Sequence, residues 1–202
     1  MFDSGMKNLG WLFIAFLVAI VILFMVYPAQ PAEPTLRDRL VQVQQQVGTR
    51  AEPTVDADAM ADAVLAVTND RDWIALLITI AAHESRLSAR IAANECKPWE
   101  CDAVKRRDPL THELITFHQA AGLFQEHRNA NNAGTWGSPE LAVQVRSGYA
   151  LLRRSYWSCR RLAPSTNWVA FTINAYAGKR CDAEWQGLTD RLATWQRVRA
   201  KL

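Results

Sequence analysis

A glutamate stands where an apolar helix is predicted to end, and its type and position suit proton transfer. The run from Trp73 to Ala82 is almost wholly apolar and leads directly into His83, Glu84 and Ser85. A carboxyl group that leaves a hydrophobic helix into a cleft loses hydration, which disfavours its ionised form and raises its pKa. An acid that keeps its proton near neutral pH can donate it to a leaving oxygen. Glu84 is therefore the candidate general acid.

The helix that must position this glutamate has clear start signals. Asn69 or Asp70 can cap it, and the acids Asp70 and Asp72 fall in its first turn, where the helix dipole favours anions. Because the helix is apolar around most of its circumference, it should be the core helix of its domain. Further helices are predicted over residues 35–48, 56–67, 139–156, 167–175 and 183–200. No segment alternates with period two long enough to predict a large sheet, so the fold class is mainly α.

An uncharged apolar run of eighteen residues occupies positions 10–27. As a helix it would be about 27 Å long, close to the hydrocarbon thickness of a bilayer. Trp11 and Tyr27 stand at its two ends, where aromatic rings favour the membrane interface. A cleaved signal peptide is the alternative, because residues 28–32 are rich in small side chains. The apolar run is longer than a usual signal core and only Lys7 precedes it as a basic side chain, which favours an uncleaved anchor.

These features predict four parts of the 202-residue chain. The prolines after the apolar run enforce an extended exit from the membrane, and Pro53 breaks any continuous helix into the next domain. The predicted parts are a short segment 1–9, a transmembrane anchor 10–27, a stalk and linker 28–54, and a helical domain 55–202.

All four cysteines, Cys96, Cys101, Cys159 and Cys181, follow the apolar run. An even number of cysteines is typical of disulfides, which persist outside the cytosol, so we expect a single-pass inner-membrane protein whose C-terminal domain is periplasmic. Three pairings are open, and the local one, Cys96 with Cys101 and Cys159 with Cys181, is favoured. A zinc site is the alternative, but Cys-x4-Cys without a nearby histidine pair fits zinc spacing poorly. No metal or cofactor is expected.

Three short motifs follow one another along the chain: Glu84-Ser85, then Gly122-Leu123-Phe124-Gln125, then Asn174-Ala175-Tyr176-Ala177-Gly178. In this order they resemble the signatures of the lytic transglycosylase family, whose catalytic domain has a goose-type-lysozyme-like fold. The resemblance covers roughly residues 55–195. It implies a lysozyme-like helical domain behind the single transmembrane helix.

The resemblance also implies a reaction. Glu84 would be the single general acid, protonating the glycosidic oxygen between N-acetylmuramic acid and N-acetylglucosamine. It would then act as a base on the muramoyl 6-hydroxyl, which closes onto the anomeric carbon and leaves a 1,6-anhydro product. Ordinary glycoside hydrolysis uses two carboxylates. The family needs one because the substrate supplies its own nucleophile.

The remaining motif residues would bind substrate. By the resemblance, Ser85 would orient the site by hydrogen bonding, and Gln125, on a turn that Gly122 permits, would contact a sugar acetamide. Tyr176 would hydrogen-bond both the acid and the substrate. The third motif is permuted relative to the family, and Asn174 would then substitute for the family's asparagine.

The stretch between the first two motifs is longer than the family pattern and holds further acids, Asp102, Asp108 and Glu113. If one of them lies opposite Glu84, a hydrolytic muramidase becomes the alternative function. A non-catalytic peptidoglycan-binding or assembly protein of the same fold is a third. The leading expectation is a membrane-anchored peptidoglycan lyase for local wall opening, as in an envelope-spanning machine, a phage virion or wall turnover.

The charge distribution adds no further partner. Residues 146–202 carry eleven Lys or Arg and three Asp or Glu, within a chain of net charge +3. We interpret this region as a solvated helix face. No motif predicts specific nucleic-acid binding.

Overall fold

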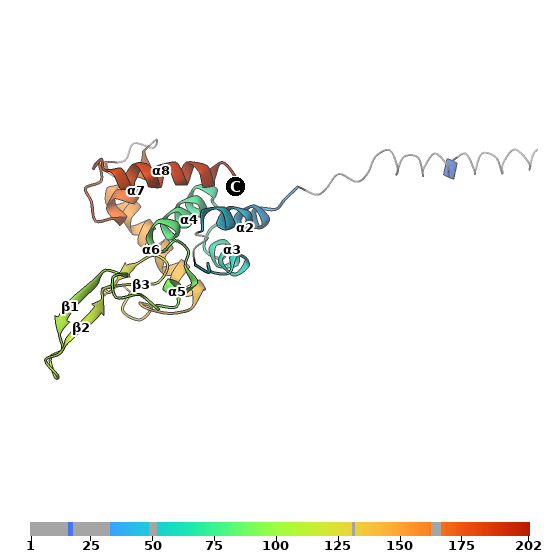
Figure 1. The fold of residues 1–202 in the computed structure, drawn as a ribbon. Coiled ribbons are helices and arrows are strands. Elements are labelled where there is room, and N and C mark those ends of the chain that lie inside the picture. The colour runs from blue at the N-terminus through green and yellow to red at the C-terminus, as the bar shows by residue number, and fades with distance from the viewer. Residues whose placement is uncertain (1–15, 18–32, 49–51, 131, 163–166) are drawn as a thin grey trace, which may run out of the picture. The chain divides into compact units, whose positions relative to one another are not determined.

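The chain divides into two units, Met1–Pro34 and Thr35–Leu202, in its computed structural model, which describes residues 16–17, 33–48, 52–130, 132–162 and 167–202 (Figure 1). The predicted anchor 10–27 lies outside the described residues except for Phe16 and Leu17. Among the residues that are described, no helix is both long enough and apolar enough to cross a membrane. The second unit contains all the elements discussed below.

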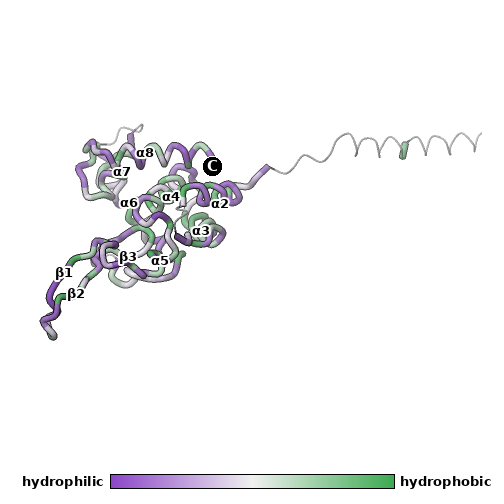
Figure 2. The backbone as a smooth tube through the Cα atoms, in the orientation of Figure 1, coloured by the Kyte–Doolittle hydropathy of each residue, from purple (hydrophilic) through white to green (hydrophobic). Residues whose placement is uncertain are grey.

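Helix α4, Arg71–Ser85, lies at the centre of the second unit. The side chain of Asp70 caps it, since Oδ1 accepts from the main-chain nitrogen of Asp72 at 2.8 Å. Every residue from Ile74 to Ala81 is buried, which confirms the prediction of a core helix. In Figure 2 the green of hydrophobic residues runs through α3 and α4.

Six more helices lie in the described part of the chain, and they confirm a mainly α fold. Helix α4 packs chiefly against α8 and also contacts α6 and α3, while α7 packs on α6 and α8. The helices are α2 (Leu36–Val47), α3 (Ala57–Leu65), α5 (Ala89–Ala92), α6 (Leu141–Cys159), α7 (Trp168–Tyr176) and α8 (Gln186–Arg199).

Helix α2 falls within the segment 28–54 that the sequence assigns to a stalk and linker. Thr35 caps it in a capping box with Asp38, which the sequence predicted. Leu40 and Val43 are buried, and the helix packs on α3. The helix of the predicted stalk therefore belongs to the same unit as the helical domain.

Strands are few in the described residues, as expected. Strand β1 (Ala103–Arg107) pairs antiparallel with β2 (Leu114–His118), with Ala103 opposite His118. Strand β3 (Ala120–Ala121) pairs with β4 (Glu126–His127). Figure 1 shows the β1–β2 hairpin projecting away from the helices of its unit.

Two disulfides join the cysteines locally, which confirms the favoured pairing. Cys96 bonds Cys101 within the loop between α5 and β1, and Cys159 at the end of α6 bonds Cys181 beyond α7. The second bond therefore ties the end of α6 to the segment that leads into α8.

Candidate functional site

A cleft of about 1230 Å³ opens on the surface of the second unit. This volume exceeds the roughly 300–1,000 Å³ of a usual small-molecule pocket, so the cleft can hold a chain-like ligand. Its lining brings together residues from all three sequence motifs: Glu84 and Ser85 at the end of α4, Gln125 before β4, and Tyr176, Ala177 and Gly178 at the end of α7. Segments about ninety residues apart thus meet at one surface.

The end of α4 presents Glu84 to the cleft. The helix ends after Ser85 because Arg86 adopts a left-handed conformation with φ 56°. The Glu84 side chain is 21% exposed, and its Oε1 accepts from Nη2 of Arg191 at 2.6 Å. Ser85 is buried at the cleft wall and donates its hydroxyl to the carbonyl of Ala81 at 2.8 Å.

Arg191, on α8, is a cleft residue that the motifs do not identify. Its side chain is 15% exposed, and its guanidinium carbon lies 5.1 Å from the ring centroid of Trp185. Its Nε is buried without a hydrogen-bond partner among the described residues. The available signal was helical spacing, which places Arg191 on the same stripe of α8 as the buried Leu188 and Val198.

Glu84 is therefore held as one half of a partly buried ion pair. A guanidinium–carboxylate hydrogen bond of this kind is short and fixes the orientation of the carboxyl group. The sequence predicted a poorly hydrated acid and did not identify the arginine. The structure instead gives this carboxyl group both a cleft and a cation, and any proton-donor role must account for that cation.

Asn174 lies behind this pair and does not line the cleft. It is 1% exposed, and its Nδ2 donates to the carbonyls of Cys181 at 2.9 Å and Ala183 at 2.8 Å. Its Oδ1 accepts from Nε1 of Trp185 at 2.8 Å. Asn174 thus fixes the indole of Trp185, over which Arg191 lies. Its effect on the cleft is therefore indirect, through Trp185 and Arg191.

The turn of the second motif is built around two positive φ angles. Gly122 has φ +69°, and a Cβ there would lie 2.7 Å from Oε1 of Gln144, so glycine is required. The same Gln144 oxygen accepts from the main-chain nitrogen of Leu123 at 2.8 Å. Gln125 has φ 46°, lines the cleft and donates Nε2 to the carbonyl of Gly122 at 2.8 Å.

Tyr176 links this turn to the carboxylates. Its hydroxyl donates to the carbonyl of Phe124, rather than to Glu84 as the resemblance implies. Burial raises the pKa of Tyr176 well above its usual value, and the nearby carboxylates of Glu84 and Glu126 raise it further. The phenol therefore stays neutral and acts as a hydrogen-bond donor.

The acids proposed as a second carboxylate are not equivalent in position. Asp108 caps the hairpin turn, where the main-chain N–H groups of Thr111 and Leu110 donate to it and lower its pKa. Glu113 lies in the same turn and neither residue lines the cleft. Asp102 does line the cleft, where its Oδ2 lies 2.6 Å from Nε2 of His127.

Glu126 is a cleft carboxylate that the sequence reasoning missed. It follows Gln125 directly, lines the cleft, and accepts from Oγ of Ser147 at 2.7 Å and from Nδ2 of Asn132 at 3.3 Å. Its effect on the pKa of Tyr176 places it near the same phenol as Glu84. Adjacency to Gln125 was the signal that could have identified it.

A cluster of sulfur and nitrogen atoms lies beside the cleft but offers no ready metal site. The sulfurs of Cys96 and Cys101 and a ring nitrogen of His118 lie within 4.8 Å of one another. The disulfide occupies both sulfurs, which removes the thiolates that a metal would need. His118 in addition places Nδ1 3.0 Å from the carbonyl of Glu100.

Comparisons with protein-family models, with curated proteins and with solved structures find no match to this chain. Function has to be inferred from the residues of the cleft. They comprise a carboxylate held by an arginine, a neutral phenol, an amide on a tight turn and a second carboxylate, all along a groove of polymer size. This set can transfer protons to and from a neutral, elongated, hydrogen-bonding ligand.

Proposed function

We propose that this chain is a membrane-anchored lytic transglycosylase with a lysozyme-like helical domain. It would cleave the β-1,4 bond between N-acetylmuramic acid and N-acetylglucosamine in peptidoglycan. One observation carries the proposal: the three motifs that resemble the family are far apart in sequence, yet Glu84, Gln125 and Tyr176 line one cleft. Chance resemblances have no reason to converge in space.

In this reaction Glu84 serves first as acid and then as base. Its proton goes to the glycosidic oxygen as the bond from that oxygen to the anomeric carbon breaks. The resulting carboxylate removes the proton from the muramoyl 6-hydroxyl, and that oxygen bonds the anomeric carbon to give the 1,6-anhydro ring. No water is consumed, and Glu84 ends the cycle protonated as it began it.

Arg191 stabilises the carboxylate between these two steps. In the first step Glu84 gives up its proton while Oε1 faces this cation, so we expect the bound strand to move the arginine or to replace its hydrogen bond. The orphaned Nε of Arg191 shows that its surroundings leave the guanidinium incompletely bonded.

Gln125 would bind the substrate, and Tyr176 orders the turn that carries Gln125. The Gln125 amide lies on the cleft wall beside the disulfide, with Nε2 3.6 Å from Sγ of Cys101, and it can exchange its bond to Gly122 for one to a sugar acetamide. Tyr176 fixes the turn by its bond to Phe124 and stays uncharged.

Glu126 supports a second candidate, a hydrolytic muramidase. Two carboxylates flanking a scissile bond are the usual machinery of glycoside hydrolysis, where the second activates water or attacks the sugar. Glu84 and Glu126 both line the cleft and both act on Tyr176. The two candidates break the same bond and differ in product.

The test is product analysis with the full chain in detergent on purified peptidoglycan. We expect anhydromuramic ends by mass spectrometry; reducing ends would instead establish the muramidase. Glu84→Gln should lower the rate by about a hundred- to ten-thousand-fold, the usual contribution of general acid catalysis. Glu113→Gln, an exposed carboxylate of the hairpin turn, is the matched control and should retain the wild-type rate. Undiminished digestion by Glu84→Gln would refute the assignment, and binding without any digestion by wild type would indicate a non-catalytic wall-binding protein.

The proposed setting follows from the same features. Residues 10–27 would hold the enzyme at the inner membrane with its second unit in the periplasm, or at a virion membrane, within reach of the glycan strand. The two disulfides support an oxidising compartment. Such tethering keeps cleavage local, as an envelope-spanning assembly, a virion or wall turnover requires.

A further inference from the structure

The loop closed by the disulfide Cys96–Cys101 carries an exposed tryptophan at the cleft. Trp99 is 76% exposed and lines the cleft together with Lys97 and Glu100. Its indole nitrogen has no hydrogen bond and its ring has no aromatic or cationic partner among the described residues. An exposed indole of this kind leaves a large apolar surface in water, which commonly marks a binding site.

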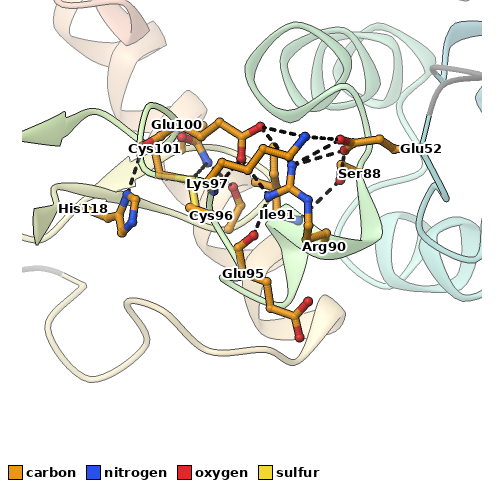
Figure 3. A network of polar contacts seen from close by, with 12 residues as sticks. Glu52, Ser88, Arg90, Ile91, Glu95, Cys96, Lys97, Glu100, Cys101 and His118 are labelled. Carbon is orange, nitrogen blue, oxygen red and sulfur yellow. Dashed lines mark hydrogen bonds and ion pairs between the residues drawn. A yellow bond between two sulfur atoms is a disulfide. The ribbon is translucent and has the colours of Figure 1, made fainter. Parts of the chain in front are cut away.

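The loop itself is held rigidly from several sides (Figure 3). Arg90 forks onto Glu100, with Nη1 2.7 Å from Oε2 and Nη2 2.9 Å from Oε1. Glu52 bridges the same arginine to Lys97, whose Nζ lies 2.8 Å from Oε1 of Glu52. From the other side, Nδ1 of His118 donates to the carbonyl of Glu100 at 3.0 Å.

This bracing has two consequences. The charges of the loop are paired with Arg90 and Glu52, so the bare indole is the feature that the loop offers to a ligand. The loop also pays little conformational entropy on binding, because the disulfide and the Arg90–Glu100 fork already order it.

The other tryptophan of the cleft is already engaged. The ring of Trp185 lies under Arg191 at 5.1 Å and near Nζ of Lys179 at 5.9 Å, and its nitrogen donates to Asn174. Trp185 therefore serves the Glu84–Arg191 pair, whereas Trp99 has a free face. The two indoles have different tasks at the same cleft.

We infer that Trp99 is a binding platform for one pyranose ring of the glycan strand, on the side of the cleft formed by the disulfide loop. A pyranose presents an apolar C–H face that matches an aromatic surface, and an indole next to paired charges favours such a neutral ring over an anion. This inference rests on the proposed function, since it takes the ligand to be the strand that Glu84 cleaves. It adds a contact on an insertion that the family motifs do not include.

The experiment separates binding from cleavage. Full-length Glu84→Gln in detergent is titrated with a β-1,4-linked hexamer of N-acetylglucosamine and, separately, with sedimented peptidoglycan. When Trp99→Ala is added to this variant, its affinity for each of the two ligands should fall by about tenfold, because one aromatic contact is lost. Trp99→Phe should restore most of the affinity. Trp157→Ala is the matched control, because Trp157 is 50% exposed on α6 but does not line the cleft.

Each outcome is decisive. Equal affinity with and without the Trp99 indole, or an equal loss with Trp157→Ala, would overturn the platform while leaving the proposed function intact. If the wild type binds glycan in a Trp99-dependent way but never cleaves it, the proposed enzymatic function would be overturned and the platform retained. Absence of glycan binding by Glu84→Gln would overturn both. A thiol titration that finds no free cysteine in Trp99→Ala verifies that the loop has kept its disulfide.

Discussion

At the residue scale, Arg191 is the direct partner of Glu84. Its Nη2 lies 2.6 Å from Oε1 of Glu84 and fixes the orientation of that carboxyl group. Trp185 and Asn174 hold that arginine in place through a stacked ring and an indole hydrogen bond. Glu84 and the arginine that holds it thus lie on different helices, α4 and α8.

We predict that Arg191→Met slows the cleavage of peptidoglycan. The hydrogen bond from Arg191 fixes the carboxyl group of Glu84 at the cleft, and a catalytic group that is no longer fixed can lose up to about a hundredfold in rate. Rates of muropeptide release from peptidoglycan check this. Arg197→Met, also on α8, is the control, and an unchanged rate for Arg191→Met would contradict the role of the pair.

Gly148 of α6 determines how closely the catalytic turn can pack. A Cβ at Gly148 would lie 2.6 Å from the ring of Phe124, the buried residue that precedes Gln125. Glycine to alanine inside a helix normally stabilises it by about 1 kcal/mol. Here overpacking, which costs about 1 to 3 kcal/mol, should outweigh that gain and lower the melting temperature.

Gly134→Ala is the control for this comparison, since an added Cβ there meets nothing within 4 Å. Thermal unfolding followed by circular dichroism gives both values. A Gly148→Ala variant as stable as wild type would mean that the turn can move away from α6, and the cleft wall would then be less fixed than the packing indicates.

The sequence was informative about residues whose role is local. Glu84, Gly122 and Gln125 stand in short motifs, and their positions at a helix end and a tight turn follow from neighbouring residues. Adjacency to Gln125 and helical spacing were weak signals for Glu126 and Arg191, because the places of these residues in the cleft depend on the β3–β4 pairing and on α8 packing against α4. Asn174 was expected at the substrate. In the structure it bonds Trp185, because the segment after α7 folds back onto the end of that helix.

At the scale of elements, the helices were predictable and the hairpin was not. Helices α2 and α4 can be recognised in the sequence from their cap residues, Thr35 and Asp70, and from their apolar stripes. Strand β1 is exposed at four of its five residues, and β2 is only half-buried at its least exposed positions, so neither five-residue strand shows a sustained alternation of hydrophobic and polar residues. The hairpin is specified by its turn, where Asp108 accepts two main-chain hydrogen bonds.

The charge network that braces the disulfide loop predicts a pH dependence of stability. Lys97 first, and Arg90 after it, lower the pKa of Glu52 from 4.5 to about 2, and Arg90 lowers that of Glu100. A carboxylate whose pKa is lower in the folded state stabilises the fold above its unfolded value. That stabilisation should be complete above about pH 4.5 and disappear as the pH falls toward 2.

The measurement is the difference in melting temperature between wild type and Glu52→Gln as a function of pH. The difference should be largest near neutral pH, shrink between about pH 4.5 and 2, and decrease with added salt because the paired side chains remain partly exposed. Glu113→Gln, whose carboxylate has no ion pair in the described part of the chain, should show no such trend. A constant difference for Glu52→Gln would mean that the network does not stabilise the fold.

At the scale of the whole molecule, the second unit and the apolar run 10–27 have separate tasks. Thr35–Leu202 includes its own core, both disulfides and the cleft. The apolar run was assigned from composition and length, which are properties of a segment and need no tertiary context. The cleavage that we propose at the membrane surface would use both parts on one chain.

We predict that the full chain stays in the membrane fraction through a high-salt wash and is released by detergent, because eighteen uncharged residues can span the hydrocarbon layer. A chain beginning at Thr35 should be recovered without detergent and should still cleave peptidoglycan, since every cleft residue lies beyond that point. Intact mass distinguishes the retained anchor from a cleaved signal peptide: the anchored protein keeps the full 22.8 kDa. A shortened, freely soluble product in cells would refute tethering, and the enzyme would then have to find its substrate by diffusion rather than by position.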